Sequence, residues 1–194
     1  NLDLARLTAD YDAVFLGMGL GPDSRIEAEG IDHPLVQGAV EFIAKIKMMP
    51  AEKLSWVPKM KTALVVGGGN TALDACRELK GLGVEKVIVS YRRGENEMSG
   101  YAHEFKYSRQ EGVDFWFHTL PVKFSGKGDK IVTVTVQKTA VDASGKVNLT
   151  NEKIDIDCEL VLMATGQAKL ESILKSAEGV KFEKGKLVVD KATG

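Results

Sequence analysis

One stretch of this sequence, residues 62–91, limits the fold more than any other. Residues 62–66 form an apolar run that predicts a buried strand, and residues 72–80 carry apolar side chains at helical spacing. Residues 86–91 then predict a second strand. A strand, a helix and a strand in this order make a βαβ unit whose strands run parallel. We therefore expect an α/β fold built on a Rossmann-like parallel sheet.

The turn between the first strand and the helix has the pattern Gly-x-Gly-x-x-Ala. In this pattern Gly67 permits the sharp turn, Gly69 lets the backbone approach a pyrophosphate, and Ala72 lets the helix pack closely on the strand. The free N–H groups at the start of the helix attract phosphate. The predicted contacts are Gly67, Gly68, Gly69, Asn70, Thr71 and Ala72. The alternative is a tight structural turn that binds nothing.

The end of the second strand indicates which dinucleotide is bound. A site for NAD usually has Asp or Glu there, to bind the ribose 2′-OH. Here the strand is followed by Arg92 and Arg93, and the first acidic residue is Glu95. A guanidinium binds a 2′-phosphate through forked, charge-assisted hydrogen bonds. The sequence thus favours NADP(H), with a solvated pair of arginines as the alternative. Lys106 and Arg109, on the next predicted helix, add positive potential or form its solvent face.

The rest of the sequence extends this sheet and adds a second one. We expect helices near residues 37–48, 102–111 and 170–177, and further buried strands at 11–17, 113–118 and 160–164. Residues 131–137 alternate valine and threonine with a period of two, which predicts an antiparallel β-meander with short strands near 147 and 154–156. A hairpin-like tail runs to residue 190.

Two of the predicted strands end in a similar turn. Gly17-Met18-Gly19 follows residues 11–16, and Ala164-Thr165-Gly166 follows residues 160–163. Gly17-x-Gly19-x-Gly21 is not a second dinucleotide fingerprint, because Pro22 follows at once and no helical pattern begins there.

Composition excludes several other classes of protein. The 26 Lys and Arg residues are balanced by 27 Asp and Glu, without the basic excess typical of a nucleic-acid binder. No apolar run reaches the ~20 residues of a membrane helix. Cys76 and Cys158 are far apart and form no CxxC, which argues against an iron–sulfur cluster held within this chain. We expect no metal site, no nucleic-acid or membrane partner, and a cytoplasmic location.

The motifs together resemble a known family. The segments Val66-Gly67-Gly68-Gly69-Asn70-Thr71-Ala72-Leu73-Asp74, Tyr91-Arg92-Arg93, Glu97-Met98 and Glu111-Gly112-Val113 are similar to the NADPH-binding domain of the glutamate synthase small (β) subunit family. That family also resembles the flavin-bearing part of dihydropyrimidine dehydrogenase. In its two-dinucleotide-domain relatives, the NADPH domain is inserted into an FAD domain. Met18 and Ser99 stand where the family usually has Thr and Pro, which puts one flavin-side contact and one loop contact in doubt.

The resemblance implies a division of the chain. Residues 1–35 would be the edge of an FAD domain, 36–61 a connector helix and linker, 62–166 the NADPH domain, and 167–194 a return segment toward the FAD domain. Gly17 and Gly19 would lie at the outgoing crossing, and Ala164, Thr165 and Gly166 at the returning one. Since the chain starts at Asn1 and stops at Gly194, we expect a piece of a longer polypeptide.

The resemblance also implies an activity for the parent protein. NADPH would pass a hydride to FAD, and electrons would continue through iron–sulfur centres to a partner subunit or domain. This piece would bind NADPH, would not hold FAD firmly, and would be inactive alone. No residue here need act as an acid or base, so no catalytic residue is predicted. The alternatives are a nucleotide-sensing module without redox turnover and a Rossmann scaffold with an empty site.

Overall fold

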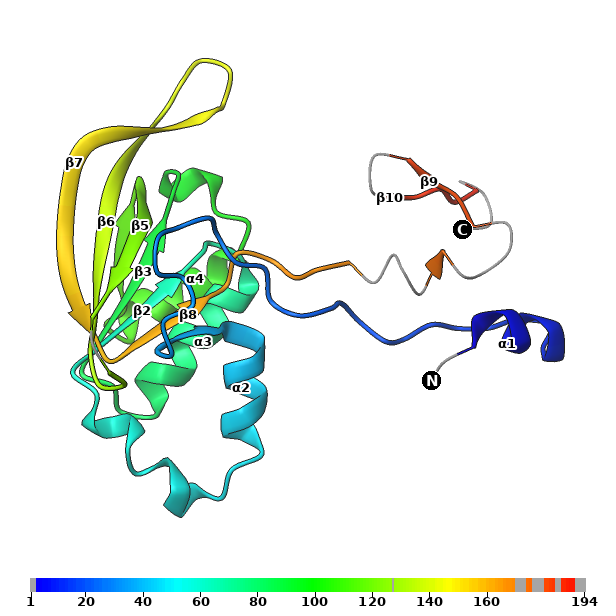
Figure 1. Cartoon of the computed structure of the whole chain (residues 1–194), viewed down its shortest axis with the longest axis horizontal. Helices are drawn as coiled ribbons and strands as arrows, with labels where there is room; N and C mark the ends of the chain where they lie inside the picture. Colours follow the sequence, from blue (N-terminus) through cyan, green and yellow to red (C-terminus); the bar gives the residue numbers. More distant parts are fainter. Residues whose placement is uncertain (1–2, 127, 170–173, 176–179, 184–185, 191–194) are drawn as a thin grey trace. The chain divides into compact units, whose positions relative to one another are not determined.

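The computed structural model describes residues 3–126, 128–169, 174–175, 180–183 and 186–190. The chain divides into two compact units. The core unit comprises Pro22–Gln167, and the terminal unit comprises Asn1–Gly21 together with Ala168–Gly194. The core unit contains the whole predicted βαβ segment, and Figure 1 shows how its elements are layered.

The core unit is built on a parallel sheet with the strand order β1-β8-β2-β3-β4. Its strands are β1 (Val36–Gly38), β2 (Thr62–Val66), β3 (Lys86–Tyr91), β4 (Asp114–Phe117) and β8 (Leu160–Met163). β2 and β3 confirm the predicted βαβ unit, and the α/β fold class is confirmed with it. β1 was missed, because three residues are too few to show a periodic pattern.

Helices cover one face of this sheet (Figure 1). They are α2 (Ala39–Lys47), α3 (Asn70–Gly81) and α4 (Ala102–Gln110), with short 3₁₀ turns η1 (Ala51–Leu54), η2 (Val57–Lys59) and η3 (Glu95–Glu97). The inward side chains of α2 and α3, such as Phe42 and Leu79, pack with Ala63 and Val65 of β2. Glycines in the left-handed region end two of the helices, Gly83 after α3 (φ 92°) and Gly112 after α4 (φ 83°).

An antiparallel meander covers the other face of the sheet. Its strands are β5 (Thr119–Ser125), β6 (Val132–Val141) and β7 (Val147–Cys158). The alternation in residues 131–137 has the predicted effect, because Val132, Val134 and Val136 are buried against the sheet, whereas Thr133 and Thr135 are partly exposed. Thr133, for example, donates a hydrogen bond of 2.6 Å to Asp157. The structure adds β5, which was not predicted, and joins the two short strands expected near 147 and 154–156 into the single strand β7.

The terminal unit contains α1 (Leu4–Asp10) and the short antiparallel pair β9 (Phe182–Glu183) and β10 (Lys186–Leu187). The buried strand expected at residues 11–17 was wrong, since these residues form neither helix nor strand and Phe15 is 95% exposed. A strand needs a neighbour to satisfy its backbone, and no described strand pairs with this segment. Most of the helix expected at 170–177 lies outside the described residues.

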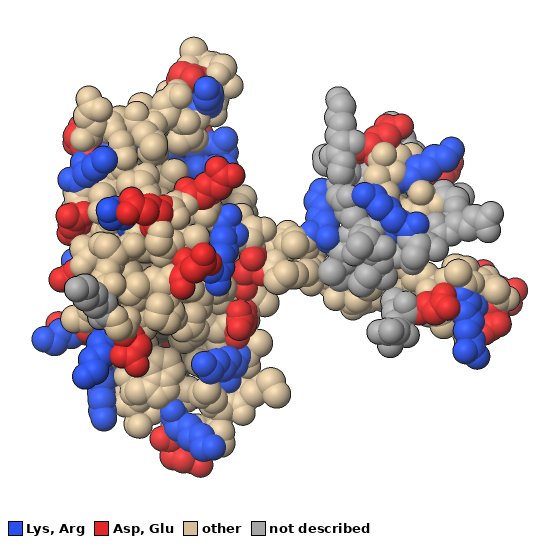
Figure 2. Space-filling view, in the orientation of Figure 1, with Lys and Arg blue, Asp and Glu red and all other residues tan. Residues whose placement is uncertain are grey.

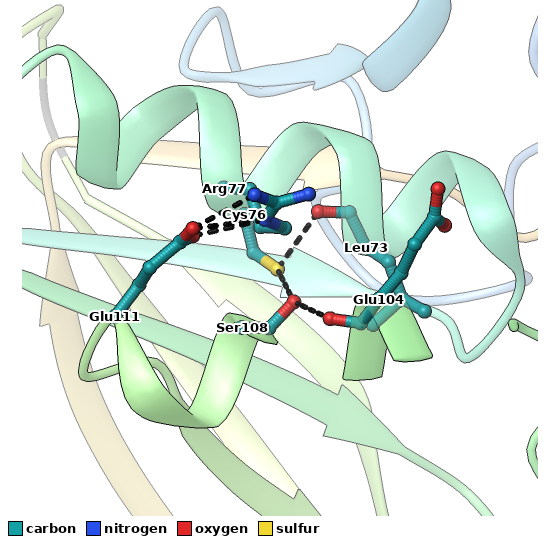
Figure 3. Close-up of polar contacts among 6 residues, drawn as sticks. All are labelled: Leu73, Cys76, Arg77, Glu104, Ser108 and Glu111. Atoms are coloured by element: carbon teal, nitrogen blue, oxygen red, sulfur yellow. Dashed lines mark hydrogen bonds and ion pairs between the residues drawn. The ribbon is translucent and has the colours of Figure 1, made fainter. Parts of the chain in front are cut away.

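Polar contacts fix α4 against α3 (Figure 3). Arg77 on α3 forms a forked ion pair with Glu111 at the end of α4, with N···O distances of 2.8 and 3.0 Å. Ser108 donates to the carbonyl of Glu104 at 2.8 Å and lies 3.8 Å from the sulfur of Cys76. These contacts hold α4 against α3.

Neither cysteine is expected to react while the protein is folded. Cys76 on α3 and Cys158 at the end of β7 are fully buried, and burial raises their thiol pKa values to about 11 and about 12. The thiolate is the reactive species, and an ordinary cysteine has a pKa of about 8.5. A thiol-specific reagent at a pH of about 8 should modify neither residue in the native chain and both after unfolding. Rapid loss of one thiol in the native state would contradict this assignment.

Candidate functional site

The glycine turn links β2 to α3 and contacts the neighbouring strand ends closely. Gly67 donates to the carbonyl of Ser90 at 3.0 Å, and Ala164 donates to the carbonyl of Val66 at 2.8 Å. Gly67 has a φ of 140°, and a Cβ atom there would lie 2.2 Å from the carbonyl oxygen of Ala164. Gly67 is therefore required by both backbone conformation and space.

The end of the turn, at Gly69, has free space beside it. Gly69 has a φ of −97°, and a Cβ atom there would meet only the Oγ of Ser99, at 3.5 Å. Its carbonyl caps the helix by accepting from the amides of Ala72 and Leu73. In the described part of the chain, no protein group accepts from the amides of Gly69, Asn70 or Thr71. These amides, at the positive end of the helix dipole, can bind an anion.

The loop after β3 is tied down over the turn. The carbonyl of Gly68 accepts from the amides of Ser99 and Gly100 at 3.2 and 3.1 Å. Asn70 Oδ1 accepts from the amide of Tyr101 at 2.8 Å. The Asn70 side chain thus fastens this loop, a role the sequence did not indicate. Ala72 is fully buried and packs in the core between helix and sheet.

The two predicted arginines differ in their surroundings. Arg92 is exposed, and its guanidinium makes no ion pair with any described residue. Arg93 is half-buried; its Nε lies 3.7 Å from Glu97 Oε1 and has no hydrogen-bond partner in the described chain, although that atom is buried. Glu97 Oε2 instead accepts from the amide of Gly94 at 2.9 Å. Both arginines retain hydrogen-bonding capacity for an incoming anion.

A cleft of about 710 Å³ lies at the carboxyl ends of the central strands. Of the residues predicted from the sequence, it is lined by Gly67, Gly68, Gly69, Thr71, Arg92, Arg93, Ala164, Thr165 and Gly166. This is the edge at which open α/β sheets bind their ligands. The structure therefore places the glycine turn, the arginine pair and the Ala-Thr-Gly turn around one space, although each residue's part in binding stays a prediction.

One wall of the cleft was missed by sequence reasoning. Residues 24–27 line it, and hydrogen bonds hold them to the end of β8. Thr165 Oγ1 donates to the carbonyl of Ser24, and the amide of Ser24 donates to the carbonyl of Gly166, both at 2.8 Å. These contacts join residues 141 and 142 positions apart, so no local sequence pattern could have revealed them.

The other predicted residues lie elsewhere. Gly17 and Gly19 belong to the terminal unit, in backbone without helix or strand. No helix follows Gly21 before α2, as expected for a turn that is not a dinucleotide fingerprint. Arg109 pairs with Glu95 at 2.9 Å and stacks on the ring of Phe105, so it does not face the cleft as a free cation.

A larger hollow of about 930 Å³ lies beside α2 and α3 but is a weaker candidate. Four of its charged side chains pair with one another, Lys47 with Glu78 at 2.7 Å and Arg77 with Glu111 at 2.8 Å, and Lys80 donates to backbone carbonyls. Figure 2 likewise shows basic and acidic side chains interspersed over the face of the core unit that it presents. Charges that are already paired leave little to recognise a ligand.

Two further features are absent from the described residues. There, no group of three or more His, Cys, Asp or Glu side chains could hold a metal ion. The helices among these residues are also too short or too polar for any of them to cross a membrane.

Comparison with known proteins gives consistent matches. A family model described as pyridine nucleotide-disulphide oxidoreductase matches residues 4–193. The NADP(+)-dependent formate dehydrogenase subunit beta of Moorella thermoacetica is 31% identical over 201 residues, which covers 100% of this chain and 28% of that protein. The glutamate synthase (NADPH) small chain of Escherichia coli strain K12 is 33% identical over 180 residues, covering 86% of this chain and 38% of that protein. The chain therefore spans well under half the length of these curated relatives.

The fold has solved counterparts. FprA from Mycobacterium tuberculosis, solved in complex with NADPH, superimposes with a TM-score of 0.63 at 21% identity, covering 84% of this chain and 51% of FprA. This similarity supports the fold described above, in which the parallel sheet and the antiparallel meander belong to one unit.

Proposed function

Because the chain belongs to the pyridine nucleotide-disulphide oxidoreductase family, we propose that its cleft binds NADPH as the hydride donor of a flavin-dependent oxidoreductase. The observation that carries the proposal is the shared cleft. It combines the open amides of the glycine turn with the two arginines at the end of β3. Two relatives at about 30% identity are named for NADP(+) or NADPH, which supports the same nucleotide.

The chemistry of the cleft fits NADPH. The pyrophosphate matches the amides of Gly69, Asn70 and Thr71, where the missing side chain of Gly69 leaves room for it. A 2′-phosphate matches Arg92, which has no ion-pair partner in the described chain, and Arg93, whose buried Nε lacks an acceptor. Residues 24–27 and 164–166 remain as the wall for the nicotinamide half.

In this proposal the chain binds and orients NADPH, and the flavin is bound by the parent protein. The flavin of the parent protein would supply the acceptor for the hydride of NADPH and the route for its electrons. Residues of this chain need transfer no proton. We further propose a glutamate synthase small-subunit-like arrangement, in which the remaining FAD domain and an electron-accepting subunit or domain are the partners. Gly17, Gly19, Ala164, Thr165 and Gly166 would then lie at the crossings between domains.

Calorimetric titration of the chain with NADPH and with NADH tests the proposal. We expect NADPH to bind at least about tenfold more tightly, because only NADPH offers the 2′-phosphate to the arginines. Equal or tighter binding of NADH would contradict the role of the arginines. Binding of neither nucleotide would favour the empty scaffold. If the full-length protein bound NADPH without bleaching a bound flavin, the nucleotide-sensing alternative would be favoured instead.

A further inference from the structure

The backbone that carries the two arginines is held by the meander. Thr139 Oγ1 donates to the carbonyl of Arg92 at 2.8 Å. The amide of Thr139 donates to the carbonyl of His118, also at 2.8 Å, and the amide of His118 donates to the carbonyl of Arg93 at 3.1 Å. Thr139 is only 6% exposed. Three consecutive hydrogen bonds therefore join β6, the β4–β5 junction and both arginine carbonyls.

The parallel sheet itself does not hold this segment. β3 pairs with β2 as far as Ser90 and with β4 as far as Tyr91, where its ladder ends opposite Phe117. Arg92 and Arg93 then form a bend. Their carbonyls would lack strand partners there, so the hydrogen bonds to Thr139 and His118 determine how the bend is oriented.

The backbone at His118 has an unusual conformation. Its φ is 53°, and no other described non-glycine residue has a positive φ. This conformation places the amide of His118 against Arg93 and its carbonyl against Thr139. Such conformations are retained when the surrounding structure imposes them. A second buried contact lies beside it, where the hydroxyls of Ser90 and Thr119 are 2.9 Å apart.

We propose that Thr139 is a positioning residue for nucleotide selectivity, and this rests on the function proposed above. By holding the carbonyl of Arg92, Thr139 keeps both guanidiniums directed at one 2′-phosphate. A pre-organised pair loses less conformational freedom when the phosphate binds. Without the Thr139 hydroxyl the bend relaxes, and only the part of the affinity that depends on the 2′-phosphate is lost. The contacts that the glycine turn would make are common to NADPH and NADH, so the Thr139 variant would keep them.

The test uses Thr139→Val, which removes the hydroxyl and nearly preserves shape, with Thr139→Ser as the matched control. Each variant is titrated with NADPH and NADH. In Thr139→Val we expect the Kd for NADPH to rise about three- to tenfold and that for NADH to change less than about twofold, while Thr139→Ser stays close to wild type. In an Arg92→Ala background, Thr139→Val should weaken NADPH binding by a smaller factor than it does in the wild type, because only the contribution of Arg93 is left to lose. Thr139→Ala gives an independent measurement if the valine variant does not fold.

Other outcomes separate the two proposals. Equal weakening of both nucleotides in Thr139→Val would show a merely structural role and overturn the inference. The same conclusion follows if Thr139→Ser behaves like Thr139→Val, or if the effects of Thr139→Val and Arg92→Ala simply add. If the wild-type chain shows no preference for NADPH, the proposed function itself fails. If the preference exists and is lost in Arg92→Ala but kept in Thr139→Val, only the positioning role fails.

Discussion

Replacing Gly67 by alanine should lower the free energy of unfolding by about 3 kcal/mol or more. The alanine would have to adopt a φ of 140°, which L-residues rarely do, and its Cβ would lie 2.2 Å from the carbonyl oxygen of Ala164. That oxygen belongs to the backbone at the end of β8, so it can move only if the central strands move with it. Thermal or urea unfolding, monitored by circular dichroism, measures the loss.

Gly69→Ala is the matched control in the same turn. Gly69 has an ordinary φ, and its added methyl group would meet only the hydroxyl of Ser99 at 3.5 Å. The free energy of unfolding of Gly69→Ala should change by less than about 1 kcal/mol, because alanine can adopt this φ and its main effect there is to restrict the unfolded chain. Its NADPH affinity should fall, because the added methyl group would lie where the proposed site receives the pyrophosphate. Equal losses of stability in the two variants would refute this separation of roles.

The different roles of Gly67 and Gly69 show what the sequence can and cannot predict about the glycine turn. The pattern Gly-x-Gly-x-x-Ala, placed between a buried strand and a helix, is enough to predict the turn and the direction of α3. The pattern cannot predict which atoms a side chain at each glycine would clash with, because those atoms belong to segments distant in the sequence. Gly67 faces Ala164, and a Cβ at Gly68 would lie 2.5 Å from the ring of Tyr91.

The dependence on contacts between distant segments also explains which elements could be predicted from the sequence. β2, α3, β3 and the alternating part of β6 carry periodic patterns within a few residues, and all were found. β1 has only three residues, and the cleft wall at residues 24–27 is held by contacts to residues 165 and 166. The apolar run at residues 11–17 signals a tendency to be buried, but it does not supply the strand that would pair with it. The hydrogen bond from Thr139 to the carbonyl of Arg92 likewise joins segments far apart in the sequence, and no local pattern predicts it.

Replacing Arg92 by alanine should weaken NADPH binding about 10- to 100-fold and change NADH binding little. A charge-assisted hydrogen bond contributes about 1.5–3 kcal/mol, and about 1.4 kcal/mol corresponds to a factor of ten in Kd. Arg92 is exposed, lines the cleft and has no ion-pair partner among the described residues, so in the proposed site its whole interaction would be available to a 2′-phosphate. Calorimetry with both nucleotides measures the change in selectivity.

Two further variants distinguish a specific contact from a general loss of charge. Lys106→Ala removes the same unit of positive charge from the exposed surface of α4 and should leave selectivity unchanged. Arg93→Ala should weaken NADPH binding less than Arg92→Ala does, because the nearby Glu97 carboxylate already offsets part of the charge of Arg93. If Lys106→Ala matched Arg92→Ala, the preference for NADPH would come from the summed positive potential of this surface. If Arg93→Ala were the most damaging, the buried Nε of Arg93 would be the principal phosphate donor, and Arg92 would be the solvated member of the pair.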